Sequence, residues 1–217
     1  MSRHHVEKIT CPKCGAESEF LMWDSINTVL NPEMKEPVRT GEAFQFTCPK
    51  CGAATTVDYP FLYHQMDDRL MIFYAPADSV GTVEAIKEMK ENPMFELTED
   101  DGCLTRVVET RNQFLEKLLI FEEKLDDRII EILKLCMMAY LKESYPDYEV
   151  DEMYFWKEDG TYRFVAKLAD ENWINMAFLQ NIYDGLCDDY KDALQSDNDY
   201  VVDEHWAVRV MRKQRAK

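Results

Sequence analysis

Glycine and histidine are scarce in this chain of 217 residues, which contains seven glycines and four histidines. Four catalytic or nucleotide-binding motifs are absent: Gly-x-x-x-x-Gly-Lys, Gly-x-Gly-x-x-Gly, His-Glu-x-x-His and Gly-x-Ser-x-Gly. No apolar run approaches the ~20 residues that are needed to span a bilayer. The sequence therefore shows no signature of these enzyme classes, and we expect no membrane-spanning segment.

We expect no N-terminal export signal, because residues 1–8 contain no apolar stretch and no cleavage site of small residues. Proteins that are not exported remain in a reducing compartment, where structural disulfides are rare. The sequence therefore predicts a cytoplasmic protein in which the seven cysteines stay reduced.

Negative charge is abundant and unevenly distributed. The formal charge is −17, and residues 1–77 contribute only −3 of it, from seven Lys or Arg against ten acids. The remaining −14 lies in residues 78–217, and such a field repels nucleic-acid phosphates. Five cations gather near the end of the chain, where they also suit the negative pole of a final helix: Arg209, Arg212, Lys213, Arg215 and Lys217.

The most informative motif is a duplicated stretch, Thr-Cys-Pro-Lys-Cys-Gly-Ala, at residues 10–16 and 47–53. A Cys-x-x-Cys turn lets two thiolates reach one cation at about 2.3 Å, and a second turn completes a tetrahedron. Gly15 and Gly52 permit the positive φ that closes each turn, and the prolines fix φ between the cysteines. The pattern predicts a structural zinc site with four ligands: Cys11, Cys14, Cys48 and Cys51.

Three other roles are compatible with parts of this cysteine pattern. A pair of disulfides conflicts with the missing export signal. A thioredoxin-like redox site uses a single Cys-x-x-Cys at a helix start, whereas this chain has two matched turns. Iron bound as in rubredoxin also uses two Cys-x-x-Cys-Gly turns, so iron remains the alternative metal.

Other side chains that could bind a metal or take part in catalysis lie outside this motif. Cys103, Cys136 and Cys187 are isolated in sequence, and we expect each to be a small buried hydrophobic residue. We expect His64 to be structural, although it is the candidate for an additional ligand or a base. Acidic groups that resemble parts of a cation site are expected to be solvated faces and helix starts: residues 67–68, 100–101, 126–127, 188–189 and 197–199 with Asp203.

Hydrophobic periodicity predicts a mixed α+β chain. The expected strands before residue 110 lie at residues 19–27, 43–46, 55–58, 61–63, 70–74 and 105–109. Helices are expected at residues 80–91 and, as a pair or one kinked helix, at 111–144. A hairpin around Asp159-Gly160 follows, with strands at 153–156 and 162–168. A strand at 173–178, a helix at 180–194 and a helix from about 203 complete the chain.

These elements predict three parts. Residues 1–78 would form a zinc-ribbon-like antiparallel β module, with the zinc at one end of its sheet. Residues 79–147 would form a mainly helical region, and residues 148–217 a C-terminal α+β region.

The two Cys-Pro-x-Cys-Gly turns resemble those of CpXC-domain proteins, and the likeness covers about residues 8–130. Weaker matches accompany them at residues 24–27, 63–64, 70–74, 112–117 and 125–129. The resemblance implies a metal site and an intracellular prokaryotic origin. It implies no activity and supplies no catalytic residue.

We therefore expect a zinc-stabilised, non-enzymatic protein that serves as an interaction or scaffold module for a basic protein partner. One alternative is an enzyme with an open zinc position or a carboxylate site, in a cleft near His64. The other is nucleic-acid binding through a patch that Lys8, Lys13 and Lys50 would form with the C-terminal cations.

Overall fold

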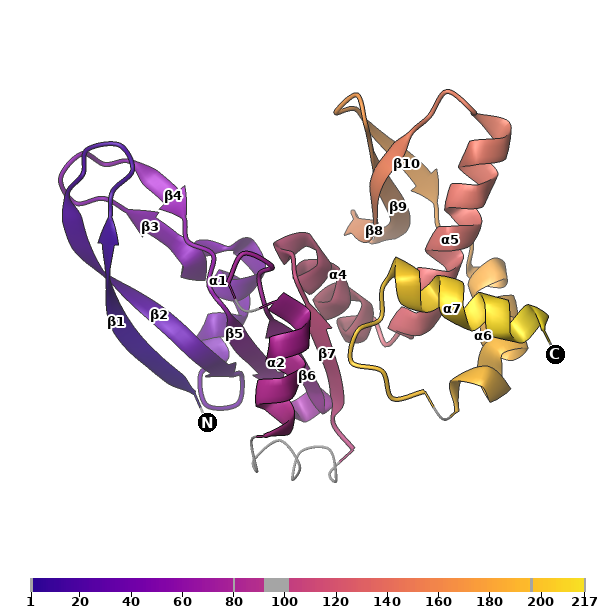
Figure 1. Ribbon diagram of the computed structural model, residues 1–217, viewed down its shortest axis with the longest axis horizontal. Coiled ribbons are helices and arrows are strands. Elements are labelled where there is room, and N and C mark those ends of the chain that lie inside the picture. The colour runs from indigo at the N-terminus through magenta and orange to yellow at the C-terminus, as the bar shows by residue number, and fades with distance from the viewer. Residues whose placement is uncertain (1, 80, 92–101, 196, 217) are drawn as a thin grey trace. The chain divides into compact units, whose positions relative to one another are not determined.

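The computed structural model describes all residues except 1, 80, 92–101, 196 and 217. These residues form two compact units, Met1–Arg111 (unit 1) and Asn112–Lys217 (unit 2). Figure 1 shows that each unit combines strands with helices. The predicted α+β fold class is therefore confirmed. No helix among the described residues is long and apolar enough to cross a membrane.

Unit 1 is built on a five-stranded sheet in the order β1-β2-β5-β6-β7. The strands are β1 (Arg3–Thr10), β2 (Glu17–Asn27), β5 (Phe61–Gln65), β6 (Leu70–Tyr74) and β7 (Leu104–Val108). The pair β5-β6 is antiparallel, as expected, and so is β1-β2, whose first strand was not predicted, whereas β2-β5 and β6-β7 are parallel. The sheet is therefore mixed. Its parallel pairs join strands that are distant in sequence, so local sequence patterns do not report them.

A second, two-stranded sheet in unit 1 pairs β3 (Gln45–Thr47) with β4 (Ala54–Thr56) in antiparallel fashion. Short helical segments precede it: η1 (Pro32–Met34), α1 (Lys35–Thr40) and η2 (Glu42–Phe44). The turn η3 (Met66–Asp68) joins β5 to β6, and α2 (Gly81–Lys90) follows β6. The two cysteine turns therefore belong to two different sheets.

Aromatic side chains form the core of unit 1 beside these sheets. Phe61 lies 4.8 Å from Phe44 and 5.5 Å from Tyr74, measured between ring centroids. The guanidinium of Arg111 stacks 3.9 Å from the centroid of Phe44, and its Nε donates to Asp58 at 3.0 Å. Because Phe44 directly precedes β3, this cluster holds the second hairpin against the main sheet.

Unit 2 combines two helical pairs with an antiparallel sheet in the order β10-β9-β8. Its elements are α4 (Arg111–Glu122), α5 (Asp127–Ser144), β8 (Val150–Glu158), β9 (Thr161–Leu168), β10 (Trp173–Ala177), α6 (Gln180–Leu194) and α7 (Glu204–Arg215). Asp159 and Gly160 both have positive φ, as the predicted hairpin turn requires.

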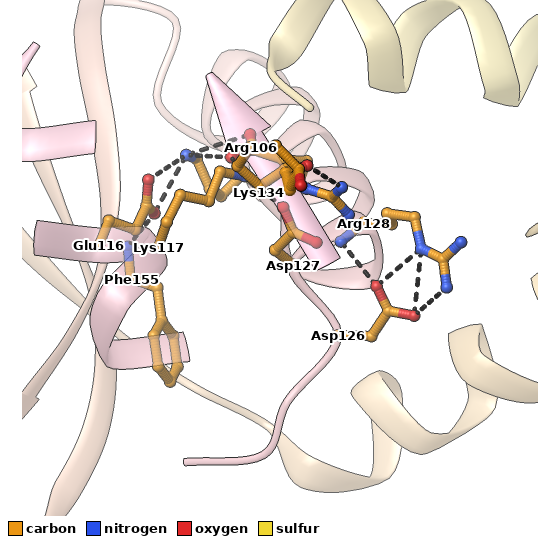
Figure 2. A network of polar contacts seen from close by, with 10 residues as sticks. Arg106, Glu116, Lys117, Asp126, Asp127, Arg128, Lys134 and Phe155 are labelled. Carbon is orange, nitrogen blue, oxygen red and sulfur yellow. Dashed lines mark hydrogen bonds and ion pairs between the residues drawn. The ribbon is translucent and has the colours of Figure 1, made fainter. Parts of the chain in front are cut away.

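Buried charges lie between α4 and α5, where a purely apolar interface would be expected (Figure 2). Lys117 Nζ lies 3.0 Å from Asp127 and 3.1 Å from Glu131, and Lys134 Nζ lies 3.1 Å from both Glu116 and Glu131. Burial opposes the charge of Lys134, but the two glutamates hold its pKa above the usual value. A buried charge is tolerated only with such partners. We call these five residues the buried ionic network.

Candidate metal centre

Each predicted cysteine pair lies in the turn of a β-hairpin. Cys11 and Cys14 connect β1 to β2, whereas Cys48 and Cys51 connect β3 to β4. Figure 1 shows the two turns at the same end of unit 1. The fold therefore brings together two turns that are far apart in sequence.

The first turn is closed by two backbone hydrogen bonds. The amide of Cys11 donates to the carbonyl of Ala16 at 2.9 Å, and the amide of Gly15 donates to the carbonyl of Cys11 at 2.9 Å. Gly15 has a φ of 70°, which lies in the left-handed region that glycine adopts at little cost. This is the conformation that the Cys-Pro-x-Cys-Gly motif predicted.

The second turn repeats the first. The amide of Cys48 donates to Ala53 at 2.8 Å, the amide of Gly52 donates to Cys48 at 2.9 Å, and Gly52 also has a φ of 70°. Identical sequences have thus folded into matching half-sites, each of which presents two thiols.

The four sulfur atoms converge on one point. Cys11 Sγ lies 3.7 Å from Cys51 Sγ, and Cys14 Sγ lies 3.7 Å from Cys48 Sγ. All four lie within 4.8 Å of one another. A regular tetrahedron with metal–sulfur bonds of about 2.3 Å has edges of about 3.8 Å. A disulfide would need about 2.05 Å, and all four cysteines are free. The group can therefore hold a metal ion, and its soft thiolate donors suit zinc or iron.

The surroundings of two of the thiols favour ionisation of Cys48 over that of Cys51. The backbone amide of Cys51 hydrogen-bonds the sulfur of Cys48 and, with the amide of Lys50 and two neighbouring thiols, lowers the pKa of Cys48 to about 6 despite burial. The amide of Ala53 lowers the pKa of Cys51, but burial and the three other thiols raise it to about 12. A shared positive charge would remove this difference, because a metal holds every ligand as a thiolate.

An apolar cluster lies beneath the sulfurs. Cys11 and Cys48 are buried with Phe46, and Phe20 and Val57 pack against them. Cys14 is partly exposed and Cys51 is exposed. The site therefore sits at the surface of unit 1 with an apolar floor, which limits the access of water from one side.

The family model for CpXC proteins matches residues 9–134, which are 126 of the 217 residues and include all four cysteines. The chain belongs to the CpXC protein family. No curated protein and no solved structure matches it significantly. The CpXC match ends within α5, so β8 to β10, α6 and α7 lie outside it.

The other cysteines and His64 stay outside the CpXC cysteine cluster. Among the residues that the structure describes, no histidine or carboxylate joins the four thiols as a possible ligand. His64 lies on β5 and is partly buried, and burial lowers its pKa. Cys103, Cys136 and Cys187 are partly buried thiols. Burial raises the pKa of Cys136 and of Cys187, which makes both poor nucleophiles.

Several acidic groups have structural roles, as expected. Asp126 accepts a hydrogen bond from the amide of Arg128 and caps α5, and Asp203 caps α7 through the amide of Trp206. Asp199 pairs with Arg209. Residues 100–101 lie outside the described residues. Within the described ranges, no group of acidic side chains gathers as a possible cation site.

Proposed function

We propose that this CpXC protein binds one zinc ion through Cys11, Cys14, Cys48 and Cys51, and that the ion is structural. The observation that carries the proposal is the pair of 3.7 Å sulfur separations, which match the edge of a zinc–thiolate tetrahedron. The two matched turns supply two ligands each. Four sulfurs complete the coordination of zinc, which leaves no position for a reacting water.

The structural role follows from the weakness of the second hairpin. Its strands β3 and β4 have three residues each and form a sheet of their own. A lone two-stranded hairpin is marginal in water. Closing the 33-residue loop between Cys14 and Cys48 costs roughly 3 kcal/mol. Structural zinc contributes on the order of 10–16 kcal/mol in small peptides, which exceeds that cost.

We further propose that the protein acts inside the cell as an interaction module for a basic protein partner. The formal charge of −17 supports this role, because it attracts cationic surfaces and repels phosphate backbones. Unit 2 alone has 23 acidic side chains against 14 Lys or Arg, a net charge of −9. Such binding weakens as salt screens the charges.

Removal of the metal tests the structural role. Chelation of the purified protein should expose the backbone amides of β3 and β4 to hydrogen exchange, while the amides of α5 remain protected. Cys14→Ser should reproduce this effect without chelator, and Cys136→Ser, a change of a thiol outside the cluster, should not. Unchanged exchange in β3 and β4 after complete metal removal would contradict the structural role.

A titration tests the partner chemistry. A decapeptide of alternating arginine and serine should bind, and its affinity should fall several-fold between 50 and 300 mM salt. A decapeptide of alternating glutamate and serine is the matched control and should not bind. If the two peptides bind equally, or if neither binds, the proposal of a basic partner is wrong.

A further inference from the structure

The outer edge of β10 in unit 2 is open. β10 is the first strand in the sheet order β10-β9-β8, and no described strand pairs with its other side. Its sequence, Trp-Ile-Asn-Met-Ala, contains no proline and no charged residue, and its ladder with β9 has no bulge. Natural sheets usually block an edge with such features, because an open edge pairs with strands of other chains. β10 therefore has the features of an association site.

Two other edge strands of the protein are blocked. At the opposite edge of the same sheet, the amide of Phe155 in β8 donates to the carboxyl group of Glu116 at 2.6 Å (Figure 2). β1, at the edge of the sheet in unit 1, carries the charged residues Arg3, Glu7 and Lys8. A charge on an edge strand discourages pairing with a further strand. β10 carries no such charge.

The register with β9 shows which backbone groups of β10 face this open edge. The amide of Leu168 in β9 donates to the carbonyl of Asn172 at 2.8 Å, so the backbone groups of these two residues face each other. Along an antiparallel ladder, hydrogen-bonded pairs alternate with pairs whose N–H and C=O groups point away from the partner strand. The even-numbered residues of β10 therefore bond to β9. The residues with outward N–H and C=O groups are Trp173, Asn175 and Ala177.

Apolar side chains are also exposed along this edge. Trp173 is 52% exposed, and Leu179 and Ile182, which follow the strand closely in sequence, are 46% and 40% exposed. In contrast, Trp206 in the core of unit 2 is 1% exposed. Removal of apolar surface from water is the main favourable contribution to most protein association. A strand bound at this edge would therefore gain apolar contacts in addition to backbone hydrogen bonds.

We propose that the β10 edge pairs with the β10 edge of a second copy of this chain, antiparallel and around a two-fold axis. In the register that pairs all three outward residues, Asn175 lies opposite Asn175 of the second copy, and Trp173 lies opposite Ala177 of the second copy. Every outward N–H and C=O group of these residues then has a partner. The sheets of the two copies become one continuous sheet.

The sequence around β10 is complementary to itself in this register. The large indole of Trp173 meets the small side chain of Ala177 once on each side of the axis, and the two Asn175 amides can bond to each other. Glu171, the nearest charged residue in sequence, would lie opposite Leu179 rather than opposite a second acid. A contact between identical surfaces requires such self-complementarity. These matches favour a second copy over an unrelated strand.

The charge of the chain sets the expected strength of the pairing. Two copies that each carry a formal charge of −17 repel each other. A single short strand also buries less surface than the interface of a typical permanent dimer. We therefore expect a reversible dimer with a Kd of about 10–100 µM, whose affinity rises as salt screens the repulsion.

Sedimentation velocity of the whole chain, loaded with metal, tests the association. A reducing agent is present so that no disulfide joins two chains. We expect the sedimentation coefficient to rise with protein concentration from that of a monomer to that of a dimer. Self-association should be about threefold or more tighter at about 500 mM than at about 100 mM salt.

Hydrogen exchange locates the interface at single residues. At protein concentrations about tenfold above the Kd, the amides of Trp173, Asn175 and Ala177 should exchange more slowly than at concentrations about tenfold below it. The amides of Ile174 and Met176 already bond to β9 and should change less, so they provide the internal control. Protection that does not follow this alternation would contradict the pairing.

Two charged variants test the two-fold register. Asn175→Lys and Asn175→Glu each place like charges opposite each other across the axis, and each should weaken self-association about threefold to tenfold. An equal mixture of the two variants places opposite charges there and should restore the dimer. Ser144→Lys, which adds the same positive charge at the exposed end of α5, is the control and should dimerise as the unchanged protein does.

A protein that stays monomeric at every concentration would overturn the proposal. A dimer that Asn175→Lys does not weaken, or that the mixture fails to restore, would overturn it as well. If a variant unfolds the sheet, the alternation of protected amides in the unchanged protein still decides the question. The result is independent of the proposed basic partner, because binding of the arginine–serine decapeptide weakens with salt whereas the dimer strengthens.

Discussion

Phe46 in β3 packs edge-on against Phe20 in β2, with ring centroids 6.0 Å apart and ring planes at 88°. This contact joins the two hairpins directly beneath the cysteine turns. The hairpins therefore meet through an aromatic pair as well as through the four thiols. Since the pair lies next to buried Cys11 and Cys48, it positions the two half-sites for a shared ion.

Phe46→Ala should weaken both the fold and metal binding. Phe46 is buried, and truncation of a buried phenylalanine costs about 3–5 kcal/mol. We expect a loss of this size in the free energy of unfolding of unit 1, measured by denaturant titration of the metal-loaded protein. Leu21→Ala in β2, at the residue next to Phe20, is the control, because Leu21 is exposed and its truncation should change stability little. Equal losses for the two variants would contradict the role of the aromatic pair.

Gly15→Ala should destabilise the first cysteine turn through the backbone alone. A Cβ at Gly15 meets no atom within 4 Å, so the cost is that of a positive φ, about 1 kcal/mol. Zinc affinity, measured by competition with a chelator, should fall about fivefold to tenfold. Gly185→Ala is the opposite case, because Gly185 lies within α6 and a Cβ there also meets nothing within 4 Å. That variant should gain about 0.5–1 kcal/mol. A neutral result for Gly15→Ala would show that the turn adapts without strain.

Glu131→Gln should destabilise unit 2 most strongly near neutral pH. Burial raises the pKa of Glu131, but Lys134 and Lys117 outweigh burial and hold the pKa below its usual value of about 4.5. A carboxyl group with a lowered folded pKa stabilises the protein above the unfolded pKa, and this stabilisation is lost as the pH falls. Removal of one partner from a buried ion pair costs about 3–5 kcal/mol.

The difference between Glu131→Gln and the unchanged protein should therefore shrink as the pH falls from 7 to below 4. Hydrogen exchange of the α5 amides measures it within unit 2, apart from the acid release of metal in unit 1. Glu143→Gln, at an exposed position near the end of α5, is the control and should show little difference at any pH. A cost for Glu131→Gln that does not change with pH would argue against an ionised Glu131.

Local patterns in the sequence predicted much of the fold. The period of apolar residues gave α6 with the bounds that the structure shows, and Asp159-Gly160 located the β8-β9 turn. Strand β1 was not predicted, because seven of its eight residues are exposed and show no alternation of apolar and polar side chains. Its pairing with β2 becomes visible only in the structure.

The cysteine site could be located from the sequence because each half is a local, repeated motif. Its convergence depends on contacts between distant strands, and Phe20 was not recognised as its floor. The buried Lys117 and Lys134 were also missed, because charged residues usually indicate solvent-exposed helix faces. Only the spacing of Glu131 and Lys134, three residues apart in one helix, hinted at a pair. The division of the chain at residues 78 and 147 stays a prediction.

We propose that the four cysteines of this CpXC protein hold one zinc ion. Elemental analysis of protein purified without added metal, combined with X-ray absorption at the metal edge, tests it most directly. We predict one zinc per chain, bound by four sulfur atoms at about 2.3 Å. A chain without metal, a site filled with iron, or a zinc ion with a nitrogen or oxygen ligand in place of a sulfur would contradict this account.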